Sequence, residues 1–316
     1  IGVVRAGCGQ DAAELMKTAD TALYWAKADG RNRYALFDEE RHRGDVDRFA
    51  VAARMPEALA RGEFSVEYQP LVELADRTAV GVEALVRWTL PGGRRLDPGR
   101  FVPLAEDSGF IVPLGRWVLA RACRHAAGWG AADPAVRPLV SVNVAARQLR
   151  EPAYVDDVAT VLDETGWPAE LLQLELTESA LMGTPDGSLA ALHTLAGMGV
   201  RIAIDDFGTG YSNFAYLRQL PVHALKLAGP FVTGAAAGAE WGEQVDREVV
   251  GLVIALAHTL GLTVTAESVE TADQFAHLQQ LGCDTGQGWF FAVPVPAEQI
   301  PPLLARRLGE LPSRSG

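Results

Sequence analysis

Cysteine is scarce in this sequence, and a long apolar run is missing. Three cysteines occur in 316 residues, far apart at Cys8, Cys123 and Cys283. An odd number of widely spaced cysteines forms neither a disulfide framework nor a metal-ligand pair, so we interpret them as free thiols in a reducing, cytoplasmic compartment. The most apolar stretch, Val249 to Leu262, is interrupted by polar residues and two glycines, which favours a buried helix over a membrane span. We therefore expect no membrane contact from this segment.

Positive charge is also in short supply. Lys and Arg number 28 against 40 Asp and Glu, which gives a formal net charge of −12. Binding to a DNA or RNA polymer needs clustered Lys and Arg that displace counterions, so we do not expect such a polymer as partner. A small anionic substrate stays compatible with this charge, because a bound metal can reverse the local sign of an acidic pocket. Neither an initiator Met nor a signal peptide begins the chain, so we expect a fragment of a longer protein, which leaves an upstream membrane anchor open.

Residues 1–40 differ in kind from the rest. A helical pattern runs from Asp11 to about Ala28, followed by a turn and a short strand from Arg33 to Phe37. One helix and one strand cannot bury a core of their own. We therefore expect two parts: residues 1–40, which include the start of a linker helix, and a larger domain over residues 41–316.

Strand-like and helical patterns alternate through the larger part. The strand-like runs are Phe64–Glu73, Ala79–Trp88, Pro138–Val144, Leu172–Thr177, Val200–Asp205, Ala224–Leu227, Thr263–Ala266 and a weak run at Gly288–Phe291. Such alternation favours parallel βαβ units, and about eight strands favour a closed barrel. No Gly-x-Gly-x-x-Gly follows the first strand, which argues against a dinucleotide-binding fold. Since no helix separates the first two strands, the sequence predicts an α/β, TIM-like (βα)₈ barrel with an irregular antiparallel first strand.

Oxygen-bearing side chains stand near the ends of these apolar strands. They are Glu83, Asn143, Glu175, Asp205, Asp206 and Glu267. Burying a carboxylate costs several kcal/mol unless it is paired or bound to a metal. Because the carboxyl ends of barrel strands converge on one mouth, we expect these groups to form a site there. An all-oxygen set suits Mg²⁺ or Mn²⁺, and the missing His and Cys cluster argues against zinc.

Lys226 is the one cation on an otherwise apolar strand, HALKLAG. A buried lysine is costly, so we expect it to pair with the carboxylates or with a substrate phosphate, and a surface-facing lysine is the alternative. The loop FGTGYSNF after Asp206 contains two glycines and small polar residues, which can bring backbone N–H groups close to a phosphate.

Seven runs follow one another along the chain. They are EALVRW (Glu83–Trp88), SVNVAARQL (Ser141–Leu149), LELTES (Leu174–Ser179), DDFGTGYS (Asp205–Ser212), LK (Leu225–Lys226), AESVE (Ala266–Glu270) and GCDTGQG (Gly282–Gly288). In this order they resemble the motifs of EAL-type cyclic di-GMP phosphodiesterases, over about residues 45 to 310. In front of them, Ala19 to Phe37 resembles the last helix and strand of a GGDEF-type diguanylate cyclase domain. The Gly-Gly-Asp-Glu-Phe turn itself is missing from the sequence, so we expect no cyclase activity.

The resemblance implies two divalent ions, Mg²⁺ or Mn²⁺. It suggests that Asp205 is shared between them, that Asp206 holds the second ion, and that Glu267 is a further ligand or an acid–base group. The remaining ligands of the first ion would be Glu83, Asn143 and Glu175.

Other motif residues receive roles from the same resemblance. Lys226 and Gln287 would orient the nucleophilic water, which makes them catalytic together with Asp206 and Glu267. Glu178 matches a glutamate that braces the loop after Asp206. Gln69 and Arg87 match positions that contact the substrate.

The function implied is hydrolysis of cyclic di-GMP to the linear dinucleotide pGpG in bacterial second-messenger signalling. Two metals would activate water and clamp the phosphate. The resemblance also implies sensor domains upstream and is compatible with a homodimer. Cyclic di-GMP is the expected partner.

Two departures from the family pattern keep alternatives open. Ala228 stands where the family usually has the Asp of Lys-Ile-Asp, and Ser268 replaces the glycine of Ala-Glu-Gly-Val-Glu. Since residues two apart on a strand share a face, Ala228 removes a carboxylate from beside Lys226. The alternative function is a degenerate receptor that binds cyclic di-GMP without cleaving it, and a third is a barrel metalloenzyme acting on another phosphate ester.

Overall fold

The computed structural model describes residues 1–5, 11–133, 136–182, 186–208, 217, 219–233 and 242–309. The chain divides into two compact units, Ile1–Ala58 and Leu59–Gly316, and the division falls within helix α2 (Glu39–Ala60). Within the described residues, no helix combines the length and the apolar character needed to cross a bilayer.

The first unit is built on helix α1 (Ala12–Ala28) and two short parallel strands, β1 (Gly2–Val3) and β2 (Ala35–Leu36). Asp11 caps α1 by accepting a 2.7 Å hydrogen bond from the backbone N–H of Glu14. The buried indole of Trp25 stacks on Phe37 and donates to Asp45 at 2.6 Å. The helix and the strand predicted for this region are both present, and the strand is shorter than its sequence pattern.

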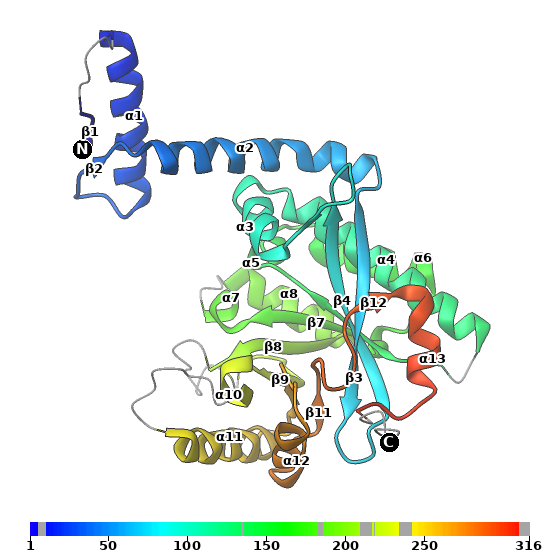
Figure 1. The fold of residues 1–316 in the computed structure, drawn as a ribbon. Coiled ribbons are helices and arrows are strands. Elements are labelled where there is room, and N and C mark those ends of the chain that lie inside the picture. The colour runs from blue at the N-terminus through cyan, green and yellow to red at the C-terminus, as the bar shows by residue number, and fades with distance from the viewer. Residues whose placement is uncertain are drawn as a thin grey trace, which may run out of the picture. The chain divides into compact units, whose positions relative to one another are not determined.

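A closed barrel forms the second unit (Figure 1). In the described part of the chain its strands are β3 (Phe64–Glu73), β4 (Ala79–Thr89), β6 (Leu139–Asn143), β7 (Leu172–Thr177), β8 (Arg201–Phe207), β9 (Ala224–Leu227), β10 (Thr263–Ala266) and β11 (Thr285–Gly286). From β4 through β11 each strand is parallel to the next. Strand β3 closes the ring and runs antiparallel to both β4 and β11. The predicted α/β barrel with an antiparallel first strand is confirmed.

Helices surround the barrel, and two short strands extend it (Figure 1). Strand β5 (Arg95–Leu96) pairs with β4, and β12 (Val295–Pro296) pairs with β3. The described helices of this unit are α3 (Pro98–Ser108), α4 (Ile111–Ala132), α5 (Ala146–Leu149), α6 (Tyr154–Thr165), α7 (Glu178–Met182), α8 (Asp186–Gly197), α10 (Gly229–Thr233), α11 (Gly242–Thr259), α12 (Ala272–Gln280) and α13 (Ile300–Leu304), with 3₁₀ turns η1 (Ala169–Leu171) and η2 (Ala297–Gln299).

The strands are buried on both faces, but the two faces differ in chemistry. On β7, Leu172, Leu174 and Leu176 alternate with Gln173 and Glu175, and all five are buried. Because successive side chains of a strand point to opposite faces, one face is apolar and the other lines the barrel interior with polar groups. The same alternation on the neighbouring strands gathers the polar residues inside the barrel.

The weak strand predicted at Gly288–Phe291 is wrong. The last barrel strand is β11, and residues 288–291 form a turn instead. A Cβ atom at Gly288 would lie 2.1 Å from the carbonyl oxygen of Val269, so this glycine permits a close backbone approach. Phe290 and Phe291 pack against the ring of Phe275, so these aromatic side chains stabilise the turn.

Candidate functional site

Lys226 lies at the centre of a buried cluster of carboxylates. Its side chain is 1% exposed, and the surface-facing alternative for this lysine is therefore wrong. The carboxylate oxygens within reach of its Nζ belong to Glu267 at 2.6 Å, Glu175 at 2.8 Å, Glu83 at 3.3 Å and Asp205 at 3.4 Å. These residues come from five different strands or strand ends, so the expected convergence at one mouth is present. Below, these side chains, together with Asp206 and with Asn143, which donates a hydrogen bond to Glu83, are called the floor of the site.

Two amide side chains fix the carboxylate of Glu83. Asn143 donates to its Oε1 at 2.6 Å, and Gln287 donates to its Oε2 at 2.7 Å. Gln287 also donates to Gln69 at 3.0 Å, and Gln69 donates to the carbonyl of Ala292 at 3.0 Å. The buried Oε1 of Gln287 has no hydrogen-bond partner within the described residues. A buried acceptor of this kind suits a water or a cation at the floor.

Gln173 and Ser141 support the site but were missed in the sequence. Gln173 donates to Ser141 at 2.9 Å and to Glu175 at 3.3 Å, and both are buried. Each precedes a floor residue by two positions on the same strand, Gln173 before Glu175 and Ser141 before Asn143. That period-two spacing was the signal that could have identified them.

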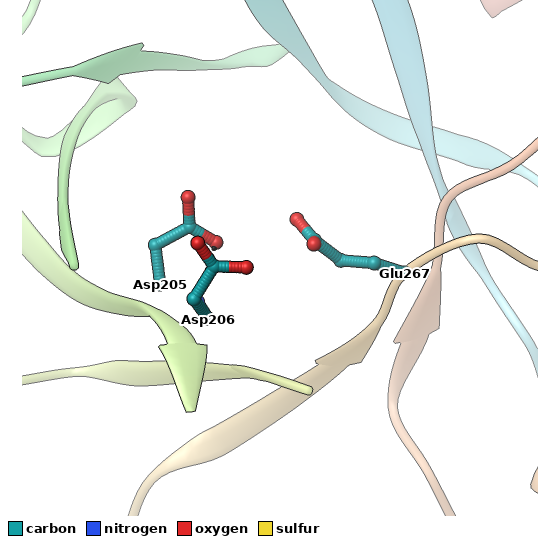
Figure 2. Close-up of side chains that lie close together, drawn as sticks. All are labelled: Asp205, Asp206 and Glu267. Atoms are coloured by element: carbon teal, nitrogen blue, oxygen red, sulfur yellow. Dashed lines mark hydrogen bonds between the residues drawn. The ribbon is translucent and has the colours of Figure 1, made fainter. Parts of the chain in front are cut away.

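Asp205, Asp206 and Glu267 bring carboxylate oxygens within 4.8 Å of one another. Figure 2 shows the two aspartates together, with Glu267 facing them from another strand. Neighbouring side chains on a regular strand point apart, but Asp206 has a φ of 53°, and the β8–β9 register is irregular here. The left-handed backbone at Asp206 therefore lets two adjacent carboxylates serve one site.

Burial makes it costly for all of the floor carboxylates to ionise together. Burial, reinforced by the charges of Glu83 and Asp205, raises the pKa of Glu175 to about 8 despite the opposing charge of Lys226. Burial likewise raises the pKa of Glu267 to about 7 and raises the pKa of Asp206. For Glu83, burial acts in the same direction, but Lys226 and the amide hydrogen bonds outweigh it and lower the pKa.

The donor set fits divalent cations. Fully ionised, the floor has five carboxylates and one ammonium group, which leaves four negative charges, the number that two divalent ions neutralise. All the donors are oxygens, the ligands preferred by hard cations such as Mg²⁺ and Mn²⁺. The unpartnered Oε1 of Gln287 is a further oxygen that can ligate a cation or accept a hydrogen bond from water.

A cavity of about 910 Å³ opens beside the floor. Asn143, Glu175 and Arg87 line it together with residues of α3, α4 and α5. A volume of this size is typical of small-molecule sites. The cavity therefore connects two floor residues to Arg87, to which the family resemblance gives a substrate contact.

Glu178 lies at the start of α7 and is 4% exposed. Its Oε2 accepts a 3.0 Å hydrogen bond from the backbone N–H of Gly208, just after Asp206. This contact is compatible with the loop-bracing role predicted for Glu178. Most of the glycine-containing loop predicted to approach a phosphate, residues 209–214, lies outside the described residues.

The two departures from the family pattern lie at neighbouring turns. Ala228 follows β9 directly and is 1% exposed, so it occupies a buried position two residues from Lys226. Ser268 has a φ of 56°, a left-handed conformation that favours glycine. A Cβ atom at Gly229 would lie 2.7 Å from the Ser268 hydroxyl, so the serine fits only because residue 229 is glycine.

Fold and site together define an α/β barrel with a cluster of carboxylates around one lysine at the carboxyl ends of its strands. The family model of the EAL domain matches residues 52–294, and the chain belongs to this family. An uncharacterized protein of Mycobacterium tuberculosis is 43% identical over 251 residues, which cover 79% of this chain and 81% of that protein.

Two further comparisons concern the protein MucR. The bifunctional diguanylate cyclase/cyclic di-GMP phosphodiesterase MucR of Pseudomonas aeruginosa is 40% identical over 297 residues. The match covers 93% of this chain but only 42% of MucR. The solved structure of the PaMucR phosphodiesterase in complex with c-di-GMP superposes with a TM-score of 0.74 at 39% identity, covering 79% of this chain and 99% of that one.

Proposed function

We propose that this chain is a divalent-metal-dependent phosphodiesterase that hydrolyses cyclic di-GMP to the linear dinucleotide pGpG. The single observation that carries the proposal is the floor itself, five carboxyl groups and Lys226 beside the substrate-sized cavity. Membership of the EAL family and the likeness to a phosphodiesterase structure that holds c-di-GMP support the choice of substrate.

Floor residues would hold the ions, and these are Glu83, Asn143, Glu175, Asp205, Asp206 and Glu267. When bound, Mg²⁺ or Mn²⁺ supplies Lewis-acid stabilisation of the phosphate charge and lowers the pKa of water. In the reaction one water adds across a P–O3′ bond, so that the new P–O bond leaves a 5′-phosphate and the 3′ oxygen takes up a proton.

The chain's own side chains would orient the reactants. Lys226 contacts four carboxylates, and where bound cations draw some of these carboxylates away, its ammonium group would donate a hydrogen bond to the attacking water. Gln287 offers its unpartnered Oε1 as an acceptor for the same water. Glu267 faces Asp205 and Asp206 and would either complete the ligand set or take up a proton from the attacking water. Arg87 would bind the dinucleotide at the cavity wall.

A receptor that binds cyclic di-GMP without cleaving it is the second candidate. The observation that favours it is Ala228, which is buried near Lys226 and provides no carboxylate. If the carboxylate that the family usually has there is needed for turnover, the floor would still attract ligand but would not complete hydrolysis.

The two candidates are separated by one incubation. The protein is mixed with cyclic di-GMP and Mg²⁺ or Mn²⁺, and the products are resolved by chromatography beside a sample that contains excess chelator. Linear pGpG, formed only without chelator, supports the phosphodiesterase. Intact ligand recovered from a tight complex supports the receptor. If the protein neither cleaves nor binds cyclic di-GMP, both candidates are contradicted.

We infer that residues 1–40 are the end of a GGDEF-type domain and that residues 41–316 contain the EAL domain. The helix and strand of the first unit, with Trp25 buried between them, are compatible with such a remnant. The match to MucR, a bifunctional cyclase and phosphodiesterase, extends over 93% of this chain and supports the same inference.

A further inference from the structure

A second charged group lies at the barrel mouth and is not part of the floor. Glu67 on β3 accepts a 2.9 Å hydrogen bond from Nε of Arg87 on β4. Its other oxygen contacts the guanidinium of Arg95 on β5. The Glu67 side chain is only 10% exposed, Arg87 is 17% exposed and Arg95 is 56% exposed. Below, Glu67, Arg87 and Arg95 are called the rim.

The strand register places the rim next to the floor. Strands β3 and β4 are antiparallel, with Gln69 opposite Glu83 and Glu67 opposite Leu85. Arg87 follows Glu83 by four positions, so both side chains lie on the same face of β4. Glu67 therefore lies one step beyond the Gln69–Glu83 pair, in the direction of the carboxyl end of β4 and of Arg87.

Glu67 is charged where it stands. Burial opposes its ionisation, but the hydrogen bonds from Arg95 and Arg87 outweigh burial and hold its pKa below the ordinary value. A buried carboxylate needs such partners, because an unpaired charge in this position would be costly. The rim thus has two guanidinium groups and one carboxylate, a net positive charge beside a floor of negative charge.

The contacts of Arg87 fix its guanidinium plane and leave one edge unused. Nε is bound to Glu67, and Nη1 donates to the carbonyl of Val86 at 3.1 Å. Among the residues that the structure describes, Nη2 has no hydrogen-bond partner. Arg87 lines the same cavity as the floor residues Asn143 and Glu175. A guanidinium edge held in this way can bind a phosphate oxygen without first losing rotamer freedom.

We propose that Glu67 is a positioning residue, which holds Arg87 so that its free guanidinium edge faces the phosphodiester of the substrate. The proposal rests on the proposed function. A cyclic dinucleotide has two phosphodiesters, and while the floor acts on one, the other needs a cationic partner. Arg95 braces the opposite oxygen of Glu67 and keeps the carboxylate from rotating away. The competing arrangement, in which Glu67 withholds Arg87 from the substrate, predicts the opposite sign of effect.

The test compares Glu67→Gln, Arg87→Ala and the double variant by initial-rate kinetics with Mg²⁺. Because the rim is proposed to bind the phosphodiester that water does not attack, Glu67→Gln should raise KM about tenfold and change kcat by less than about twofold. The double variant should be no worse than Arg87→Ala alone, since Glu67 acts through Arg87. Dissociation constants for cyclic di-GMP, measured by calorimetry on the same proteins, should follow KM.

Controls separate positioning from general loss of structure. Glu73→Gln makes the same substitution at an exposed position of the same strand and should leave KM unchanged. If Glu67→Gln folds poorly, Arg95→Gln removes only the exposed brace and should raise KM about two- to threefold. Arg94→Gln, at the neighbouring exposed arginine, is its matched control.

The kinetic and binding results separate a failure of the positioning role of Glu67 from a failure of the proposed function. An unchanged or lower KM in Glu67→Gln, or a double variant clearly worse than Arg87→Ala, overturns the positioning role while leaving the phosphodiesterase in place. A wild type that binds cyclic di-GMP without cleaving it overturns the hydrolysis, and the dissociation constants then test Glu67 by themselves. A wild type that neither binds nor cleaves it overturns both.

Discussion

The floor and the rim of the barrel mouth lie side by side, but their buried charges are compensated differently. On the rim, Glu67 is paired with two arginines and stays ionised without help. On the floor, Lys226 meets four carboxylates and cannot neutralise them, so protons or cations must do so. A self-compensated charge group is suited to holding a side chain still, whereas an uncompensated one is suited to binding ions.

Among the variants that test this contrast between floor and rim, Glu83→Ala should have the largest effect. Removing a floor carboxylate that also receives Asn143 and Gln287 should lower kcat by about 10³-fold, equivalent to ~4 kcal/mol of transition-state stabilisation. The rim should be unaffected, so KM or the dissociation constant should change little. Initial rates and calorimetry measure the two quantities. A wild-type rate in this variant would contradict the assignment of the floor, and Glu73→Ala is the matched control.

Ala228→Asp sharpens the comparison by adding a sixth carboxyl group near the floor. We expect hydrolysis to rise by about tenfold, ~1.4 kcal/mol, because the added carboxylate stands near Lys226. Without cations the same variant should have a lower melting temperature, since it buries one more unpaired acid. Ala228→Asn is the uncharged control. An unchanged rate would show that the alanine is harmless.

The pH dependence of stability tests the floor without any turnover. Glu175 and Glu267 have pKa values raised from 4.5 to about 8 and about 7. An acid with a raised folded-state pKa binds more protons when folded, so the chelator-treated protein should lose stability as pH rises from about 5 to about 8. We expect the melting temperature to fall by ~5 °C or more across this range.

Saturating Mg²⁺ should flatten that profile, because the cations replace the protons. The rim cannot produce the same slope, since the pKa of Glu67 is lowered and its contribution to stability is lost only at acid pH. If the melting temperature of the chelated protein does not change between these pH values, the pKa values of the floor carboxyl groups are not raised in the folded state.

Ser268→Gly should give the smallest effect. The left-handed backbone of Ser268 costs about 1–2 kcal/mol, and glycine returns part of this through its greater freedom in the unfolded chain. The net gain should be ~0.5 kcal/mol, a rise of about 1–2 °C in melting temperature by calorimetry. Ser268→Ala keeps the Cβ atom and should show no gain. Equal stability of the two variants would mean that the backbone here is unstrained.

Much of the floor could be predicted because it violates the ordinary pattern of a buried strand. Glu83 and Glu175 are acids in apolar runs, and only a shared site explains several of them together. Gln173 and Ser141 were missed because uncharged polar residues are common in strands, and a single one does not indicate a functional site. Residues 288–291 form a turn instead of the predicted strand, and Phe290 and Phe291 pack against each other there.

The rim was harder to predict from sequence. Glu67 and Arg95 lie 28 positions apart, and Glu67 and Arg87 lie 20 apart, so no local period connects them. Only the antiparallel pairing of β3, β4 and β5 brings them together. Similarly, the residues around Asp206 do not predict its left-handed backbone conformation, although this conformation allows both aspartates to face one site.

The sequence by itself determined the barrel, its antiparallel first strand and the acidic character of the site, because period-two alternation and buried acids are local properties of the chain. The tertiary structure alone decided which carboxylates share Lys226. It alone placed the floor, whose side chains have a net negative charge, beside the rim, whose side chains have a net positive charge. The physical reason is that register across strands, and the left-handed turn at Asp206, are set by packing of the whole barrel and leave no signature in neighbouring residues.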